Sequence, residues 1–165
     1  MTLLILGLVL LLGVHSLRIV ADDWRTATRA RLGAGRWRGL YSLLALAGLV
    51  LVIVGYGEAR QAPVMLWAPQ PWMRHPAALL MLVSFILIVA GNTPANAIRA
   101  KLGHPMILGV KLWAFTHLLA NHTLADLVLF GSVLVWGVLA YRAARRRDRA
   151  SGATAAATTP WRTVA

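Results

Sequence analysis

The chain has 165 residues, of which 59% are hydrophobic and 13% charged, and its mean hydropathy is +0.67. Soluble domains average about 25% charged and about 45–50% apolar residues, so this composition favours a membrane protein. The absence of cysteine excludes disulfides, thiolate metal sites, iron–sulfur clusters and cysteine nucleophiles. The net charge of +12 is compatible with nucleic acid, acidic partners or a membrane surface, and the positions of the charges decide among them.

Five apolar segments are candidates for helices that cross a bilayer, whose hydrocarbon core of about 30 Å needs about 20 helical residues. The fourth segment is less uniformly apolar than the others, because it carries Lys111 and His117. The predicted fold class is an all-α, polytopic membrane helix bundle with five transmembrane helices. The predicted spans are residues 2–20, 40–57, 77–91, 106–121 and 123–141.

The positive-inside rule predicts that the N-terminus lies outside and the C-terminus in the cytoplasm. With five spans, the arginine-rich segments 18–39, 92–105 and 142–165 are cytoplasmic, and only Arg60 and Arg74 are external. Topology therefore explains the basic charge, and we exclude nucleic acid as a partner.

The segments outside the spans have distinct predicted characters. Residues 22–39 begin with an aspartate pair that caps a short helix, end in a glycine-rich turn, and carry tryptophans among arginines, as segments on an anionic leaflet do. Residues 58–76 are rich in proline and are predicted to form an irregular external loop. A transmembrane domain is predicted over residues 1–141, followed by a basic, disordered cytoplasmic tail at 142–165.

Polar groups inside the spans are the candidate functional residues, because such groups are costly in lipid. Some of them have structural explanations. Thr123 and Asp126 are spaced as a capping box for the last helix. Lys111 is close enough to the cytoplasmic end to extend its amine to water, and His122 lies at the outer boundary.

His15 and His117 lie deeper in the predicted spans, His15 about three turns into its helix and His117 roughly 16 Å into its own at about 1.5 Å per residue. Two imidazoles on different helices are able to ligate one metal ion, typically the iron of a haem. The alternative is two neutral histidines, each hydrogen-bonded to a neighbouring helix. One histidine per helix is a weak pattern, so spacing alone leaves both interpretations open.

Neighbouring side chains extend the same hypothesis. Arg18, three residues after His15 and on the same helix face, is placed to bind a haem propionate, although the positive-inside rule explains it equally well. Trp113 and Asn121 flank His117 at a spacing of four residues, so one face offers an aromatic wall and a hydrogen-bonding amide. Packing against a neighbouring helix would equally explain these residues on one helix face.

Three stretches of the chain, LGLVLLLGVHSLRIVADDWR, GRWRGLYSL and HPMILGVKLWAFTHLLAN, resemble the NnrU family of bacterial membrane proteins. The resemblance extends over nearly the whole chain to about residue 141. The family is named for its association with denitrification and nitrogen-oxide metabolism genes, and it is related to the plant 15-cis-ζ-carotene isomerase, which uses haem b. By this resemblance His15 and His117 correspond to the two haem-ligating histidines of the isomerase. The chain departs from the relatives at Ala114, where the plant proteins have a cysteine, and at Gly103, where many relatives are expected to have an arginine.

The resemblance implies a multi-pass protein of the bacterial inner membrane that binds haem b between His15 and His117 and acts as an isomerase or a redox-linked factor on an apolar substrate. The alternative is a non-enzymatic accessory protein for nitrite or nitric oxide reduction, with nitrogen-oxide reductase components as partners. It is motivated by the lack of a complete acid–base or nucleophile set. A transporter is disfavoured because no inverted repeat or polar stripe is present. The catalytic residues and the reaction stay open, since a fold and a cofactor do not fix the chemistry.

Overall fold

The computed structural model describes residues 1–68, 70–94 and 96–152. Within these residues the regular elements are helices, apart from one isolated β-bridge between Met65 and Thr123, which confirms the all-α fold class. The chain divides into two compact units. Unit 1 comprises Met1–Ala68 and His122–Ser132, and unit 2 comprises Pro69–Asn121 and Val133–Ala165.

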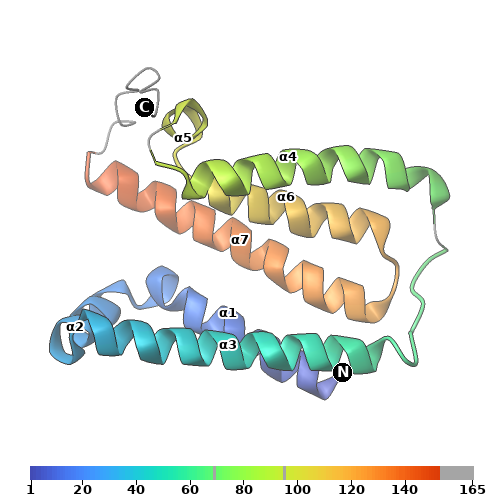
Figure 1. The fold of residues 1–165 in the computed structure, drawn as a ribbon, viewed down its shortest axis with the longest axis horizontal. Coiled ribbons are helices and arrows are strands. Elements are labelled where there is room, and N and C mark those ends of the chain that lie inside the picture. The colour runs from blue at the N-terminus through green and yellow to red at the C-terminus, as the bar shows by residue number, and fades with distance from the viewer. Residues whose placement is uncertain (69, 95, 153–165) are drawn as a thin grey trace, which may run out of the picture. The chain divides into compact units, whose positions relative to one another are not determined.

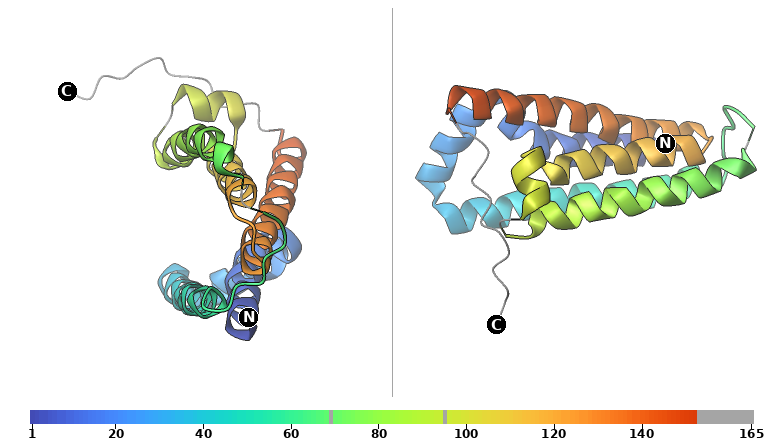
Figure 2. Two further views of the ribbon diagram at one scale, coloured as in Figure 1. Left: turned by 90° about the vertical axis from the view of Figure 1, so that its right-hand side faces the viewer. Right: turned by 90° about the horizontal axis from the view of Figure 1, so that it is seen from above.

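Unit 1 is built on two long helices that run antiparallel, α1 (Thr2–Val20) and α3 (Ala34–Ala59). A short helix, α2 (Asp22–Leu32), crosses one end of the pair and connects them (Figures 1 and 2). Glycines let the two long helices approach closely. A Cβ atom on Gly48 would lie 2.7 Å from the backbone nitrogen of Leu11, and one on Gly55 would overlap the backbone of Leu4. Close backbone approach through small residues is the usual basis of helix association in membranes.

The junction between α2 and α3 differs from the predicted glycine-rich turn. Gly33 is the single residue between the two helices, and its φ of 80° is a conformation that glycine adopts without steric cost. Gly35 already belongs to α3, which therefore begins six residues before the predicted span at 40. Asp22 and Asp23 lie in the first turn of α2, where carboxylates favour the helix dipole, but neither caps it through its side chain.

Of the irregular loop predicted at 58–76, residues 58–59 belong to α3 and residues 74–76 to α4 (Arg74–Asn92). The described residues between these helices contain no α-helix, and part of this connection is attached to the start of the last helix. The backbone N–H of Leu66 donates to the carbonyl of His122 at 2.9 Å, and the N–H of Leu124 donates to the carbonyl of Val64 at 2.8 Å. These two bonds form the β-bridge and hold residues 64–66 against the beginning of α7 (Leu124–Ala150).

Unit 2 repeats the arrangement of two long antiparallel helices with a short one across an end (Figure 2). Ser84 and Gly109 lie in contact between the two long helices: the Ser84 hydroxyl donates to the Gly109 carbonyl at 2.8 Å, and Ser84 is fully buried. Its helices before α7 are η1 (Pro71–Met73), α4 (Arg74–Asn92), α5 (Ala97–Leu102) and α6 (Pro105–Ala120).

Within the described part of the chain, four helices are long and apolar enough to cross a membrane: Thr2–Val20, Ala34–Ala59, Pro71–Asn92 and Leu124–Ala150. Side chains such as Leu43, Ile53 and Leu79 are 62–65% exposed, as expected for surfaces that face lipid. The shorter α6 has 16 residues, or about 24 Å at about 1.5 Å per residue, against a core of about 30 Å. Its role as a fifth span, and the sides on which the termini lie, stay predictions.

Helix α7 continues well beyond the predicted end of the transmembrane domain at Tyr141, because it ends at Ala150. Its first turns belong to unit 1 and its remainder to unit 2. Ala143 and Ala144 in the extension are buried. Within the tail predicted to be disordered, residues 153–165 lie outside the described part of the chain.

Candidate functional site

The predicted haem-site residues fall into two groups, one in each unit. His15 and Arg18 are on α1 in unit 1, whereas Trp113 and His117 are on α6 in unit 2, with Asn121 directly after that helix. His15 lies five residues before the end of α1, and His117 lies in the last turn of α6. His15 contacts residues of α1 and α3, and His117 contacts Trp113 and Asn121.

His15 is oriented by the backbone of its own helix and by an aromatic ring. Its Nδ1 lies 2.7 Å from the carbonyl oxygen of Leu11, and its ring packs edge-on against Tyr41 of α3 at a centroid distance of 5.4 Å. A carbonyl can only accept, so Nδ1 carries the hydrogen and the neutral imidazole has its lone pair on Nε2. Metal-binding histidines commonly donate their second nitrogen to a backbone carbonyl in this way.

Arg18 occupies the last turn of α1 and has an exposed side chain. Its position three residues after His15 places both on the same side of the helix. A guanidinium there is suited to a carboxylate or a phosphate at the end of α1.

Trp113 and His117 of α6 form one cluster with Asn121, which follows the helix. The Trp113 ring lies against that of His117 with centroids 4.7 Å apart. The Asn121 amide nitrogen is 2.9 Å from the carbonyl oxygen of His117 and 3.3 Å from its Nδ1. Because the amide oxygen would repel that carbonyl, the NH₂ group must face it, and Nδ1 therefore accepts a hydrogen bond.

His117 consequently has the opposite tautomer to His15. With Nδ1 as an acceptor, the hydrogen of the neutral ring is on Nε2. His117 can ligate a metal through Nε2 only when this proton is on Nδ1 or is lost, and the Asn121 amide that faces Nδ1 disfavours the first of these states. The donor chemistry therefore fits a haem ligand directly at His15 and conditionally at His117. Among the described residues, no three or more His, Asp or Glu side chains form a metal-binding group by themselves.

Asp126 is the most buried carboxylate among the described residues and accepts several hydrogen bonds. The backbone N–H and the hydroxyl of Thr123 donate to its Oδ2 at 2.9 and 2.6 Å, and the Asp126 N–H lies 3.2 Å from the Thr123 hydroxyl oxygen. This confirms the predicted capping box. The phenol of Tyr56 donates to Oδ1 at 2.5 Å and so ties α3 to α7 within unit 1.

Tyr56 was not predicted as a site residue, because it is an aromatic residue at the end of an apolar span, where such residues are common. A signal was present, however. Tyr56 and Asp126 lie at ends of two predicted spans that face the same side of the membrane. A buried carboxylate needs hydrogen-bond donors, and the phenol of Tyr56 is a donor that the predicted topology places at the same depth in the membrane.

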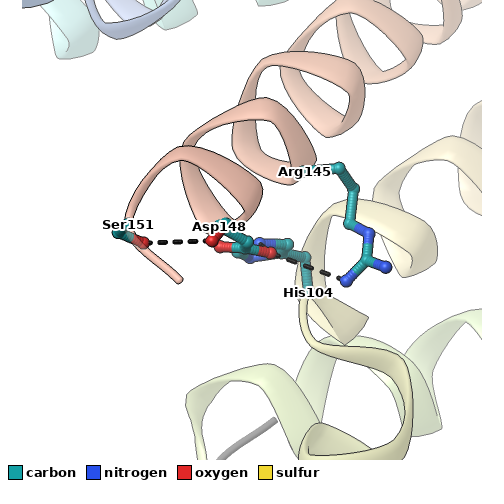
Figure 3. Close-up of polar contacts among 4 residues, drawn as sticks. All are labelled: His104, Arg145, Asp148 and Ser151. Atoms are coloured by element: carbon teal, nitrogen blue, oxygen red, sulfur yellow. Dashed lines mark hydrogen bonds and ion pairs between the residues drawn. The ribbon is translucent and has the colours of Figure 1, made fainter. Parts of the chain in front are cut away.

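A second polar cluster, also missed, joins the start of α6 to the end of α7 (Figure 3). The Nε2 of His104 is 2.9 Å from an oxygen of Asp148, and a guanidinium nitrogen of Arg145 is 3.6 Å from the same oxygen. The His104 ring also packs edge-on against Tyr141. No sequence signal links these residues, which are 44 positions apart.

Lys111 lies close to this cluster and has a partner inside unit 2. Its amine is 4.9 Å from the centroid of the Tyr141 ring, within the range of a cation–π interaction. Its stem passes Gly137, on which a Cβ would lie 2.7 Å from the Lys111 Cγ. The structural role predicted for Lys111 thus includes packing against α7.

Comparison with known proteins identifies one family. The family described as NnrU protein matches residues 3–165. Comparisons with curated proteins and with solved structures find no significant match.

Proposed function

This chain belongs to the NnrU protein family, and on that premise we propose that it is an integral protein of the bacterial inner membrane that binds haem b through His15 and His117. Apolar helices compatible with a bilayer support the membrane part of this proposal. The haem part rests on the resemblance and on the chemistry of the two imidazoles.

The observation that carries the proposal is the hydrogen bond from His15 Nδ1 to the Leu11 carbonyl. It fixes the ring and selects the tautomer whose Nε2 is able to ligate iron. A haem bound here supplies a one-electron redox centre and a Lewis acid. The protein supplies imidazole ligands and an apolar surrounding.

The remaining site residues have assigned roles in this proposal. Arg18, at the exposed end of α1, binds a carboxylate of the cofactor. Trp113 restricts the ring of His117 and offers a flat apolar surface, and Asn121 sets the protonation of that histidine. The substrate of the proposed isomerase or redox-linked activity is apolar, in keeping with residues that lie in or near lipid.

A second candidate function is a non-enzymatic accessory role in nitrite or nitric oxide reduction, with reductase components as partners. It is favoured by the state of the buried carboxylate, because Asp126 has its oxygens occupied by Tyr56 and Thr123. A carboxylate held in this way stabilises the fold and is poorly placed to transfer a proton to a substrate.

The test is the absorption spectrum of the full chain, expressed with excess haem, purified in detergent, and recorded oxidised and reduced. We expect a Soret band that is lost or shifted in His15→Ala and in His117→Ala. The exposed His75 provides the matched control, since His75→Ala removes an imidazole elsewhere. The haem proposal fails if no Soret band appears, or if the band persists when His15→Ala and His117→Ala are combined. In either case, a stable complex of the protein with a reductase would support the accessory role.

A further inference from the structure

We propose that one end of unit 2 is a binding surface for the headgroups of anionic phospholipids, a function independent of haem binding. Two basic segments that are distant in the sequence form this surface, which we call the basic end. One is the short helix α5 and the other is the last part of α7. Its exposed cations are Arg99, Lys101, Arg142, Arg145, Arg146 and Arg149.

Contacts between the α5–α6 junction and α7 bring the two segments together. His104, which precedes α6, binds Asp148 of α7 at 2.9 Å (Figure 3). Next to it, a Cβ built on Gly103 would be 3.5 Å from a guanidinium nitrogen of Arg145. The last turn of α5, which holds Arg99 and Lys101, therefore lies beside the end of α7.

The α7 extension has two faces with different compositions. Ala140, Ala143 and Ala144 are buried, and Asp148 follows on that side to meet His104. The four exposed arginines of α7 in the basic end occupy helix positions i, i+3, i+4 and i+7, which form one stripe. The extension is thus an amphipathic helix whose polar stripe is entirely cationic.

Acidic side chains do not neutralise this surface. Asp148 is the one acidic residue in segments 97–104 and 142–150, and it is engaged by His104 and by Arg145. The remaining cations retain a strong excess of positive charge. Arginine binds phosphate oxygens through two parallel N–H donors, so a phosphodiester suits the stripe.

The continuity of the stripe with the apolar surface selects a lipid as the occupant. Val135 and Leu139 on α7 are 61% and 47% exposed, and the same helix face continues through Arg142 and Arg146 to Arg149. A lipid whose acyl chain lies along the apolar part therefore has its headgroup at the arginines. Neither free phosphate nor an acidic soluble protein would use both parts of this face.

Native mass spectrometry of the delipidated full chain in neutral detergent, with phosphatidylglycerol or phosphatidylcholine added, tests the proposal. We compare the wild type with Arg142→Gln/Arg146→Gln. The control, Arg60→Gln/Arg74→Gln, removes the same charge from exposed arginines that lie outside the basic end and outside the basic segment 22–39. Glutamine has a helix propensity close to that of arginine, so both variants are expected to fold.

The wild type is expected to retain phosphatidylglycerol in preference to phosphatidylcholine. Each arginine near a charged headgroup contributes about 1 kcal/mol, so the α7 variant should lose that preference by about tenfold or more. The control variant should lose less than about threefold. Equal losses in both variants, no preference in the wild type, or displacement of the lipid by millimolar inorganic phosphate would each overturn the proposal.

Discussion

The phenol of Tyr56 on α3 donates a 2.5 Å hydrogen bond to the carboxylate of Asp126 on α7, 70 positions later in the chain. The bond joins two helices of unit 1 at a carboxylate that is 5% exposed. The Tyr56 ring also packs edge-on against Phe130, one turn further along α7. A single residue of α3 therefore fixes the start of α7 by a polar and an apolar contact.

Tyr56→Phe is expected to lower the free energy of unfolding by about 1–2 kcal/mol, because it removes the hydroxyl and keeps the ring against Phe130. Unfolding in detergent, followed by circular dichroism, measures the change. A double-mutant cycle with Asp126→Asn should show strong coupling, whereas additive losses would mean that the bond contributes nothing.

Gly55→Ala is expected to destabilise unit 1 by about 1–3 kcal/mol, because the added Cβ overlaps the Leu4 backbone and forces α1 and α3 apart. Gly57 is the matched control on the same helix, since a Cβ there meets nothing within 4 Å. Gly57→Ala should be neutral or slightly stabilising. The measurement is thermal unfolding of both variants. Equal unfolding midpoints for Gly55→Ala and Gly57→Ala would contradict the close packing seen at Gly55.

His104→Phe is expected to loosen the α7 extension, because it keeps an aromatic ring beside Tyr141 but loses the bond to Asp148. Trypsin should then cleave after the arginines at 145–147 severalfold faster than in the wild type, since proteolysis follows local opening. His75→Phe, at an exposed position of α4, should leave the rate unchanged. An unaltered rate in the His104 variant would show that the extension is held by its buried alanines alone.

Asn121→Leu is expected to change the tautomer of His117, because it removes the amide that donates to Nδ1. The hydrogen of the neutral ring should shift from Nε2 toward Nδ1, which imidazole nitrogen chemical shifts report directly. His15 serves as the internal control, since its bond to Leu11 is untouched. If His117 is a haem ligand, the same variant should retain haem at least as well as the wild type; a loss of haem would mean that Asn121 supports ligation.

Much of the fold was predictable, because burial in lipid imposes a strong pattern on sequence. Long apolar runs identified the four helices able to cross a membrane, and the Thr123–Asp126 spacing identified the cap of α7. Helix ends were less predictable. Helix α3 begins among glycines and arginines and α7 continues through RAARRRDR, because backbone hydrogen bonds continue after the apolar pattern stops.

The candidate site was predictable only in part. Trp113 and His117 share one face of α6 and Asn121 follows directly after its end, so the spacing of four residues itself brings the three together. The tautomers of His15 and His117 did not follow from the sequence, because they depend on which nitrogen meets a carbonyl or an amide.

The sequence by itself determined that this protein is helical, apolar and basic, because those properties depend on composition and on local periodicity. Only the tertiary structure decided which distant polar groups meet: Tyr56 with Asp126, and His104 with Asp148. The physical reason is that hydrophobicity acts on each segment separately, whereas a hydrogen bond requires two particular atoms within about 3 Å and depends on how the helices pack.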